Sequence, residues 1–190
     1  EIPDVAAGDL YESVNDVVYP GDDPGPADRF VGLEHVERNL GERSGSASID
    51  DLKGRKLRFS EGDVLYGYLR PYLNKVWVAD GPGLCSVEQY VLRPAAGVDP
   101  RMLGHALRGQ RTLDAVNAAT HNLQLPRIRA GLLAAVRVPD IRKAPPGLVD
   151  RLDAINARAL AATRLEARSR ELVASVLPSA RNEEFGALLA

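Results

Sequence analysis

The chain has 190 residues, of which 45% are hydrophobic and 26% charged, and its formal net charge at pH 7 is −2. At roughly 100 to 200 residues per domain, this length allows one domain, or one domain with an appended helix, and leaves no room for a multidomain machine. The apolar runs are far shorter than the roughly 18 residues that span a bilayer, and no signal segment opens the chain. The single cysteine, Cys85, permits no internal disulfide. We therefore expect a soluble, cytoplasmic protein without a membrane partner.

The charges are unevenly distributed along the chain. Residues 1–100 hold 10 Lys and Arg against 18 Asp and Glu, whereas residues 101–190 hold 14 against 8. Within the acidic half, residues 53–75 carry six basic side chains and two acidic ones. Such a basic stripe is typical of a nucleic-acid footprint, because neutralised phosphates supply most of the sequence-independent affinity. A solvated loop with scattered cations fits the same counts, so charge alone leaves both interpretations open.

The first hundred residues are predicted to form short strands separated by turn residues. Gly, Pro and Asp punctuate the chain wherever the alternating apolar pattern stops. The predicted strands cover residues 16–19, 29–36, 56–59, 64–69, 75–79 and 84–92, with a loop at 40–51. This pattern indicates a small mixed or mostly antiparallel sheet.

The period changes at Asp99, where helices begin. Asp99 is a good N-cap and Pro100 suits the first helical position, which predicts a helix from residue 100 onward. Further helices are expected at 112–119 and 126–133, followed by a strand at 134–138. The expected fold class is therefore α/β, more closely α+β, with short helices beside the sheet.

A long helix is predicted after the Pro145-Pro146 pair. No helix breaker occurs before Pro178, and the segment is rich in Ala, Leu, Arg and Glu, so a rod of about 48 Å is expected. A domain of this size cannot cover so long a helix, which favours coiled-coil pairing with a partner helix. A helix that lies along its own domain with Ala inward is the alternative. The candidate partner-helix residues are Leu148, Leu152, Ile155, Val173 and Val176.

Several kinds of catalytic apparatus are missing from the sequence. It contains no phosphate-binding loop with Lys-Ser/Thr, no Gly-x-Gly-x-x-Gly after a strand and no Gly-x-Ser-x-Gly elbow. The three histidines share no ligand-type spacing with Cys85, so we expect no metal and no cofactor. One enzymatic alternative stays open, a metal-dependent DNA-processing enzyme that uses Asp63 and Glu88. Otherwise a non-catalytic binding protein is expected.

Residues 59–75, called here the central motif, carry the most specific signal. They read Phe-x-x-Gly-Asp-Val-Leu and then Leu-Arg-Pro-x-x-x-Lys. Residues 30–36 precede them with Phe-Val-Gly-Leu-Glu-His-Val, and residues 84–94 follow with Leu-Cys-Ser-Val-Glu-Gln-Tyr-Val-Leu-Arg-Pro. These three segments resemble the signature of target-recognition domains in the specificity subunits of type I restriction-modification systems. The resemblance extends over residues 29–175. It departs from the family at residues 139–148, where the usual Pro-Pro-Leu-x-x-Gln is interrupted and lacks its Gln.

The resemblance implies a non-catalytic, sequence-specific DNA-binding subunit or half-subunit of such a system, or of a related DNA-modification system in phage defence. It would direct methyltransferase and endonuclease subunits to one half of a bipartite site. Its partners would be double-stranded DNA, a methyltransferase subunit, a restriction subunit, and a second copy or second recognition domain held through the long helix. Residues 1–143 would form the DNA target-recognition domain, 144–178 the connecting or dimerisation helix, and 179–190 a tail. A protein-interaction module that acts through the helix alone is a further alternative.

Two loops are expected to face the DNA. Cations before the central motif's turn would contact phosphates, whereas Arg70, held before Pro71, would present its guanidinium to guanine and Asn74 its amide to adenine. The polar loop 120–129 would be the second DNA-facing segment. In the alternative interpretation Arg70 pins a strand end through an internal salt bridge and the second loop only links helices. The predicted DNA-contacting residues are Lys53, Lys56, Arg58, Arg70, Tyr72, Asn74, Lys75, His121, Asn122, Gln124, Arg127 and Arg129.

Overall fold

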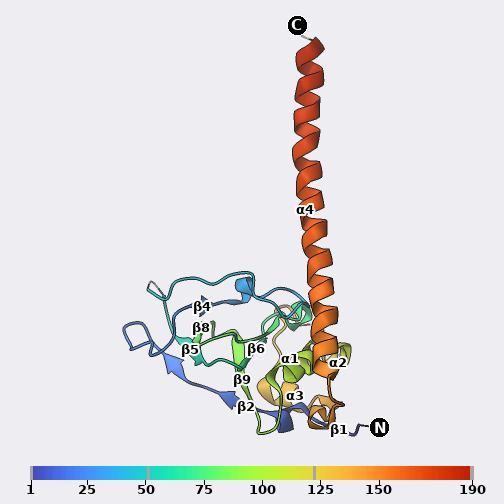
Figure 1. Ribbon diagram of the computed structural model, residues 1–190. Helices are drawn as coiled ribbons and strands as arrows, with labels where there is room; N and C mark the ends of the chain where they lie inside the picture. The colour runs from blue at the N-terminus through green and yellow to red at the C-terminus, as the bar shows by residue number, and fades with distance from the viewer. Residues whose placement is uncertain (1, 51, 122, 189–190) are drawn as a thin grey trace. The chain divides into compact units, whose positions relative to one another are not determined.

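The computed structural model describes residues 2–50, 52–121 and 123–188. The chain divides into two units, Glu1–Val149 and Asp150–Ala190. The strands and short helices belong to the first unit, and the second unit is helical (Figure 1).

The first unit contains three small sheets. The central sheet is fully antiparallel, in the order β2 (Tyr11–Val14), β9 (Gln89–Pro94), β6 (Val64–Gly67) and β7 (Val76–Val78). A second sheet has the order β3 (Val17–Val18), β5 (Lys56–Phe59), β8 (Gly83–Cys85) and β4 (Phe30–Val31), and only its β4–β8 pair is parallel. A two-stranded sheet joins β1 (Asp4–Ala6) to β10 (Arg137–Pro139). The expected small, mostly antiparallel architecture is confirmed.

Three short helices belong to the same unit: α1 (Pro100–Arg108), α2 (Gln110–Thr120) and α3 (Ala130–Ala134). Asp99 caps α1 as predicted, since its carboxylate accepts hydrogen bonds from the backbone N–H groups of Arg101 at 2.7 Å and Met102 at 3.3 Å. Single 3-10 turns lie at Ala7–Leu10, Leu33–His35, Pro71–Leu73 and Ile141–Lys143.

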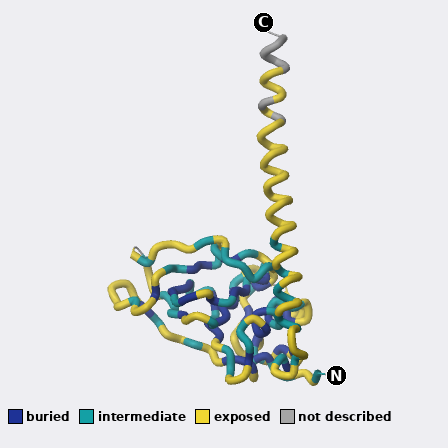
Figure 2. Tube along the Cα trace, in the orientation of Figure 1, coloured by how far each residue is buried: buried dark blue, intermediate teal, exposed yellow. Residues whose placement is uncertain are grey.

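Strand β6 lies between two core clusters, and all four of its residues are buried. Val64 and Tyr66 face a cluster that includes Leu103 and Leu107 of α1, whereas Leu65 faces Phe59 and the ring of Trp77. This alternation follows from the two-residue period of a strand. Figure 2 shows the buried stretches gathered in the sheets and short helices of this unit, with exposed loops around them. The central motif therefore supplies the middle of the hydrophobic core.

Several element boundaries differ from those predicted. Strands β1 and β2 were not expected, and the predicted strand 84–92 is interrupted between β8 and β9. The predicted strand 29–36 is reduced to β4, which a 3-10 turn at Leu33–His35 follows. The third helix begins at Ala130 and not at Pro126, because residues 126–128 are bonded to the central motif's turn. In the second unit, α4 (Leu148–Leu188) continues through Pro178, where the sequence predicted its end. A proline removes only one backbone donor, and good helix formers lie on both sides of it.

None of the helices in the described part of the chain combines the length and apolarity that a bilayer crossing requires.

The Gly-Asp pair of the central motif anchors the turn between β5 and β6. Asp63 is 1% exposed, and its carboxylate accepts hydrogen bonds from Nε and Nη2 of Arg93, each at 2.9 Å. The backbone N–H of Ser60 donates a third hydrogen bond at 2.8 Å. Gly62 has a φ of +81°, which a residue with a Cβ rarely adopts. The Asp63–Arg93 pair thus joins the β5–β6 turn to β9.

We expect the two partners of this pair to be unequal in their effect on stability. Arg93→Met leaves a buried carboxylate without its cation, at a cost of about 3 kcal/mol, whereas Asp63→Asn leaves a half-exposed guanidinium in contact with water and costs about 1 to 2 kcal/mol. Urea unfolding measures both, and Arg170→Met, which removes an exposed ion pair on α4, serves as the control. Equal costs for the two variants would contradict this account of the pair.

Candidate nucleic-acid interface

The two loops predicted to face DNA are bonded to each other in the structure. Leu69 and Arg127 form an antiparallel β-bridge. The backbone N–H of Arg70 donates to the carbonyl of Pro126 at 2.8 Å, and the N–H of Ile128 donates to the carbonyl of Tyr68 at 3.1 Å. Residues 68–74 and 123–129, called here the paired loops, therefore form one surface although they are far apart in sequence.

Arg70 occupies a rigid and unusual position in this surface. Its φ and ψ are 51° and 57°, the left-handed region, and its carbonyl accepts a hydrogen bond from Leu73 at 2.9 Å. Pro71 behind it is buried, while Arg70 itself and Tyr72 are exposed. In the described part of the chain the Arg70 guanidinium has no hydrogen-bond or ion-pair partner, so the alternative of an internal salt bridge is not supported.

Asn74 holds the turn in place, and the expectation that it contacts a base is wrong. The residue is 6% exposed, and its Nδ2 donates to the carbonyl of Arg108, the last residue of α1, at 2.9 Å. Its backbone is also left-handed, with a φ of 49°, and its N–H donates to Pro71. A side chain buried against the end of a helix cannot reach a base edge.

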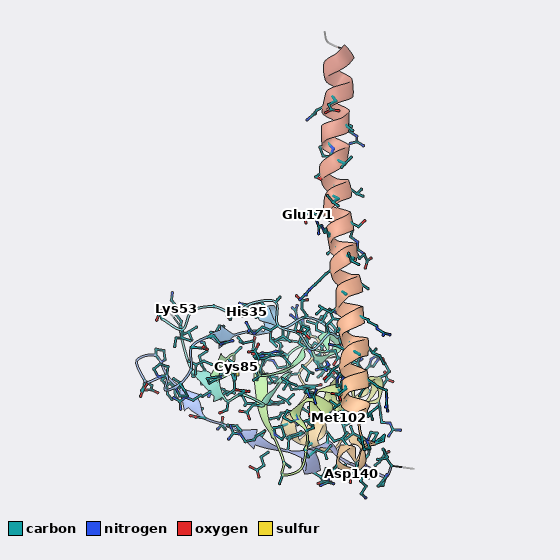
Figure 3. The ribbon with its side chains drawn as sticks, in the orientation of Figure 1. His35, Lys53, Cys85, Met102, Asp140 and Glu171 are labelled. Carbon is teal, nitrogen blue, oxygen red and sulfur yellow. The ribbon has the colours of Figure 1, made fainter. Side chains whose placement is uncertain are left out.

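Three further predicted contacts are engaged within the protein. Arg58 donates to Asp16 Oδ2 at 2.9 Å and to the carbonyls of Asp23 and Pro24. The ammonium of Lys56 donates to the carbonyls of Lys53 and Gly54, and that of Lys75 to the carbonyl of Leu33 at 2.6 Å. Lys56 and Arg58 both belong to β5, where the sequence predicted a strand. The side chains of Arg58, Lys56 and Lys75 thus donate hydrogen bonds to loop carbonyls inside the domain. Lys53 lies in the loop that precedes β5 (Figure 3).

The cations that remain without a partner are concentrated near the paired loops. Over residues 2–50, 52–121 and 123–149, six Lys or Arg side chains have no described hydrogen bond or ion pair, and they are Arg38, Lys53, Arg55, Arg70, Arg127 and Arg129. A single pocket is lined by Arg55, Arg127 and Arg129. Arg70 follows Leu69, which forms the β-bridge with Arg127. Arg55 was missed by sequence reasoning, because its place in the pocket and its lack of an ion pair among the described residues appear only in the fold. Uncompensated guanidinium groups so close together favour an anionic partner.

The second loop is exposed apart from its anchor points. His121 follows α2, and His121 and Gln124 are exposed, as are the apolar side chains of Leu123 and Leu125. Asn122, the remaining predicted contact, lies outside the described residues. The loop thus exposes polar, apolar and cationic side chains. Its backbone is held to residues 68–70 by the hydrogen bonds of Pro126 and Ile128.

The enzymatic alternative is not supported by the geometry. In the β6–β9 register Val64 pairs with Leu92 and Gly67 with Gln89, so Asp63 and Glu88 lie at opposite ends of the strand pair, about 17 Å apart. The described residues contain no group of three or more His, Cys, Asp or Glu side chains able to hold a metal ion. Cys85 is fully buried, and burial, with a smaller effect of the Asp63 charge, raises the pKa of its thiol. Such a thiol is unreactive and belongs to the core.

The second unit presents a separate candidate surface. Ile155, Leu165, Leu172, Val173 and Val176 of α4 are each more than half exposed. Leu165, Leu172 and Val176, together with Ala162 and Ser169, follow the alternating three- and four-residue spacing of a coiled-coil seam. This set, called here the α4 seam, overlaps the predicted partner residues only at Val176. Leu148 and Leu152 are half-buried.

The fold is that of a target-recognition domain from a type I restriction-modification specificity subunit. A chain from a structure on complex assembly and conformational transition of the type I R-M system matches with a TM-score of 0.71 and 18% identity, over 90% of this chain and 47% of that one. The HsdS subunit from Thermoanaerobacter tengcongensis matches with a TM-score of 0.66 and 18% identity, over 88% of this chain and 45% of that one. The S subunit from M. genitalium matches with a TM-score of 0.58 and 12% identity, over 90% and 43%.

The sequence comparison agrees with the fold. The type I restriction enzyme EcoDI specificity subunit from Escherichia coli is 30% identical over 107 residues, which are 55% of this chain and 24% of that protein. No family model matches the chain. The resemblance to type I specificity subunits is therefore confirmed. The chain spans about a quarter of the length of this curated relative and just under half of the solved chains.

We expect Asn74→Ala to act on stability and not on base preference. The change removes the hydrogen bond to the Arg108 carbonyl and places a less tolerant residue in a left-handed conformation, at a combined cost of about 2 kcal/mol. Thermal unfolding measures the loss, and Asn74→Gly, which relieves the backbone strain but still lacks the amide, should recover part of it. A full-stability Asn74→Ala variant with altered base preference would restore the original expectation.

Proposed function

We propose that the chain is a non-catalytic DNA-recognition half of a type I specificity subunit, which binds one half of a bipartite DNA site. The observation that carries this proposal is the backbone pairing of the two loops, which brings the main chains at Arg70 and Arg127 together, and neither side chain has an acidic partner among the described residues. The relatives' type I restriction-modification identity supports the same function.

The cations of the paired loops and the adjacent pocket divide into two roles. Arg55, Arg127 and Arg129 are long exposed side chains that reach phosphates without fixed geometry, which fixes the register on the duplex. Arg70 projects from a backbone held by Pro71, Leu73 and Pro126, so its guanidinium starts from a fixed point. A planar fork in a defined place suits the O6 and N7 atoms of guanine in the major groove.

The long helix supplies the partner contact in this proposal. A helix with exposed apolar side chains at coiled-coil spacing is stabilised by a second helix, either from another copy of the chain or from a second recognition domain. Methyltransferase and restriction subunits would then carry out the chemistry at the DNA site that the two recognition domains select.

The first test is the salt dependence of DNA binding. With four cations near the surface, the affinity for duplex DNA should fall with a log–log slope of about −4, and Arg129→Ala should reduce that slope by about one for every sequence alike. Arg70→Ala should cost roughly 1 to 3 kcal/mol on the cognate duplex and much less on a scrambled one. Fluorescence anisotropy at several salt concentrations measures all three quantities.

The matched control for this test is Arg38→Ala, because Arg38 is equally exposed and unpartnered but is neither in the paired loops nor in the pocket beside them. It should leave the slope unchanged. Salt-independent binding, or no binding to DNA at all, would favour the alternative of a module that acts through its helix alone.

The second test concerns the α4 seam. Leu172→Asp places an unpaired carboxylate in a helix contact and should abolish self-association, or binding to a partner helix, while the fold of residues 1–149 is kept. Ala174→Asp puts the same charge on the opposite face of the helix and is the control. Sedimentation velocity distinguishes them, and a wild-type chain that is monomeric at all concentrations would rule out a homodimer.

A further inference from the structure

The paired loops expose apolar side chains to a degree that the rest of the first unit does not. Over the described residues of that unit, the exposed large hydrophobic side chains are Tyr19, Tyr72, Leu123, Leu125 and Leu132. Three of these, Tyr72, Leu123 and Leu125, belong to the paired loops. Apolar side chains scattered singly over a surface are ordinary, whereas a group of them marks a site of interaction.

The same loops carry positive charge and no negative charge. Residues 68–74 and 123–129 contain three arginines, Arg70, Arg127 and Arg129, and neither Asp nor Glu. The three guanidinium groups have no partner in the described part of the chain. A partner for this surface must therefore be anionic and must also offer apolar groups. Duplex DNA offers both, because its phosphates carry the charge and each thymine projects a C5 methyl group into the major groove.

Leu125 occupies a backbone position beside the residue proposed to read guanine. The N–H of Arg70 donates to the carbonyl of Pro126 at 2.8 Å, and Leu125 is the residue before that proline. Its side chain is 46% exposed. A proline ring restricts the backbone of the residue that precedes it. Leu125 before Pro126 is therefore held in a defined place, as Arg70 is before Pro71.

The other two exposed apolar side chains of the paired loops are placed differently. Leu123 lines the pocket shared by three of the unpaired arginines, which the proposed function assigns to phosphates. Tyr72 carries a hydroxyl that can donate or accept a hydrogen bond, so its contacts need not be apolar. Leu125 thus combines a purely apolar side chain with a position next to Arg70.

We propose that Leu125 packs against the C5 methyl group of a thymine in the major groove, close to the guanine that Arg70 reads. A leucine side chain neither donates nor accepts a hydrogen bond. It therefore favours a base whose groove edge carries a methyl group over one that presents an unbonded amino group there, as cytosine does. The proposal rests on the proposed function and gives it a second specificity-determining side chain.

The test removes one methyl group from the DNA and leaves the base pair intact. The full chain first selects a preferred duplex from a randomised pool, and each thymine of that duplex is then replaced in turn by deoxyuridine, which lacks the C5 methyl group. One of these replacements should weaken binding about fourfold, the factor that corresponds to the burial of one methyl group. Fluorescence anisotropy measures the change.

Two protein variants show whether Leu125 is the side chain that contacts this methyl group. In Leu125→Ala the deoxyuridine replacement should no longer change the affinity, because the two changes remove the same contact. Leu132→Ala is the matched control, since Leu132 is 48% exposed but lies in α3, outside the paired loops, and this variant should keep the fourfold loss. Both variants change exposed positions, so both should unfold at the wild-type temperature.

The possible outcomes separate this proposal from the proposed function. Salt-dependent binding with equal affinity for the thymine and deoxyuridine duplexes overturns the role of Leu125 alone, and favours an apolar face for a protein partner. A selected duplex without thymine, or a deoxyuridine effect that persists in full in Leu125→Ala, overturns that role as well. Failure of the chain to bind any duplex overturns both proposals.

Discussion

Two backbone hydrogen bonds between residues 68–70 and 126–128, which together make the Leu69–Arg127 β-bridge, determine what this domain can present to a partner. They join the turn that follows β6 to the loop between α2 and α3. Because backbone hydrogen bonds fix distance and direction, the main chains at Arg70 and Arg127 are held at neighbouring positions of one surface. The same contacts place Arg127 and Arg129 at the pocket that Arg55 also lines. Without this pairing, the free cations would be scattered over separate loops.

The central motif consists mostly of scaffold residues. Asp63 is bound by Arg93, Asn74 by the end of α1 and Lys75 by a neighbouring loop, and each of these contacts is satisfied inside the domain. Arg70 is the exception, since its backbone is part of the scaffold while its guanidinium is free. This division separates a bonded frame from an exposed cationic side chain. Buried bonded groups tolerate little change, whereas exposed cations on a fixed backbone can be replaced without loss of the fold.

The second unit depends on a different kind of interaction. A single helix buries little apolar surface of its own, and Leu165, Leu172 and Val176 of α4 are exposed, so the proposed assembly covers them with another helix. In the proposed function, recognition and assembly fall to separate units, one with a hydrogen-bonded surface and the other with an apolar seam.

Local patterns were enough to predict much of the fold. The alternating apolar pattern predicts strand β5, the Asp99-Pro100 pair predicts the capped start of α1, and the composition predicts the long helix. Each of these signals depends only on residues that are close together in sequence. The resemblance of the central motif to type I specificity subunits could also be recognised from the sequence. The same is true of the positions of the two loops predicted to face DNA. The roles of particular side chains were not, because they depend on partners far away in sequence. Arg58 is neutralised by Asp16, Asn74 is buried by the end of α1, and Arg55 has no ion-pair partner among the described residues. Which polar groups are bonded and which are available is decided only when the chain folds.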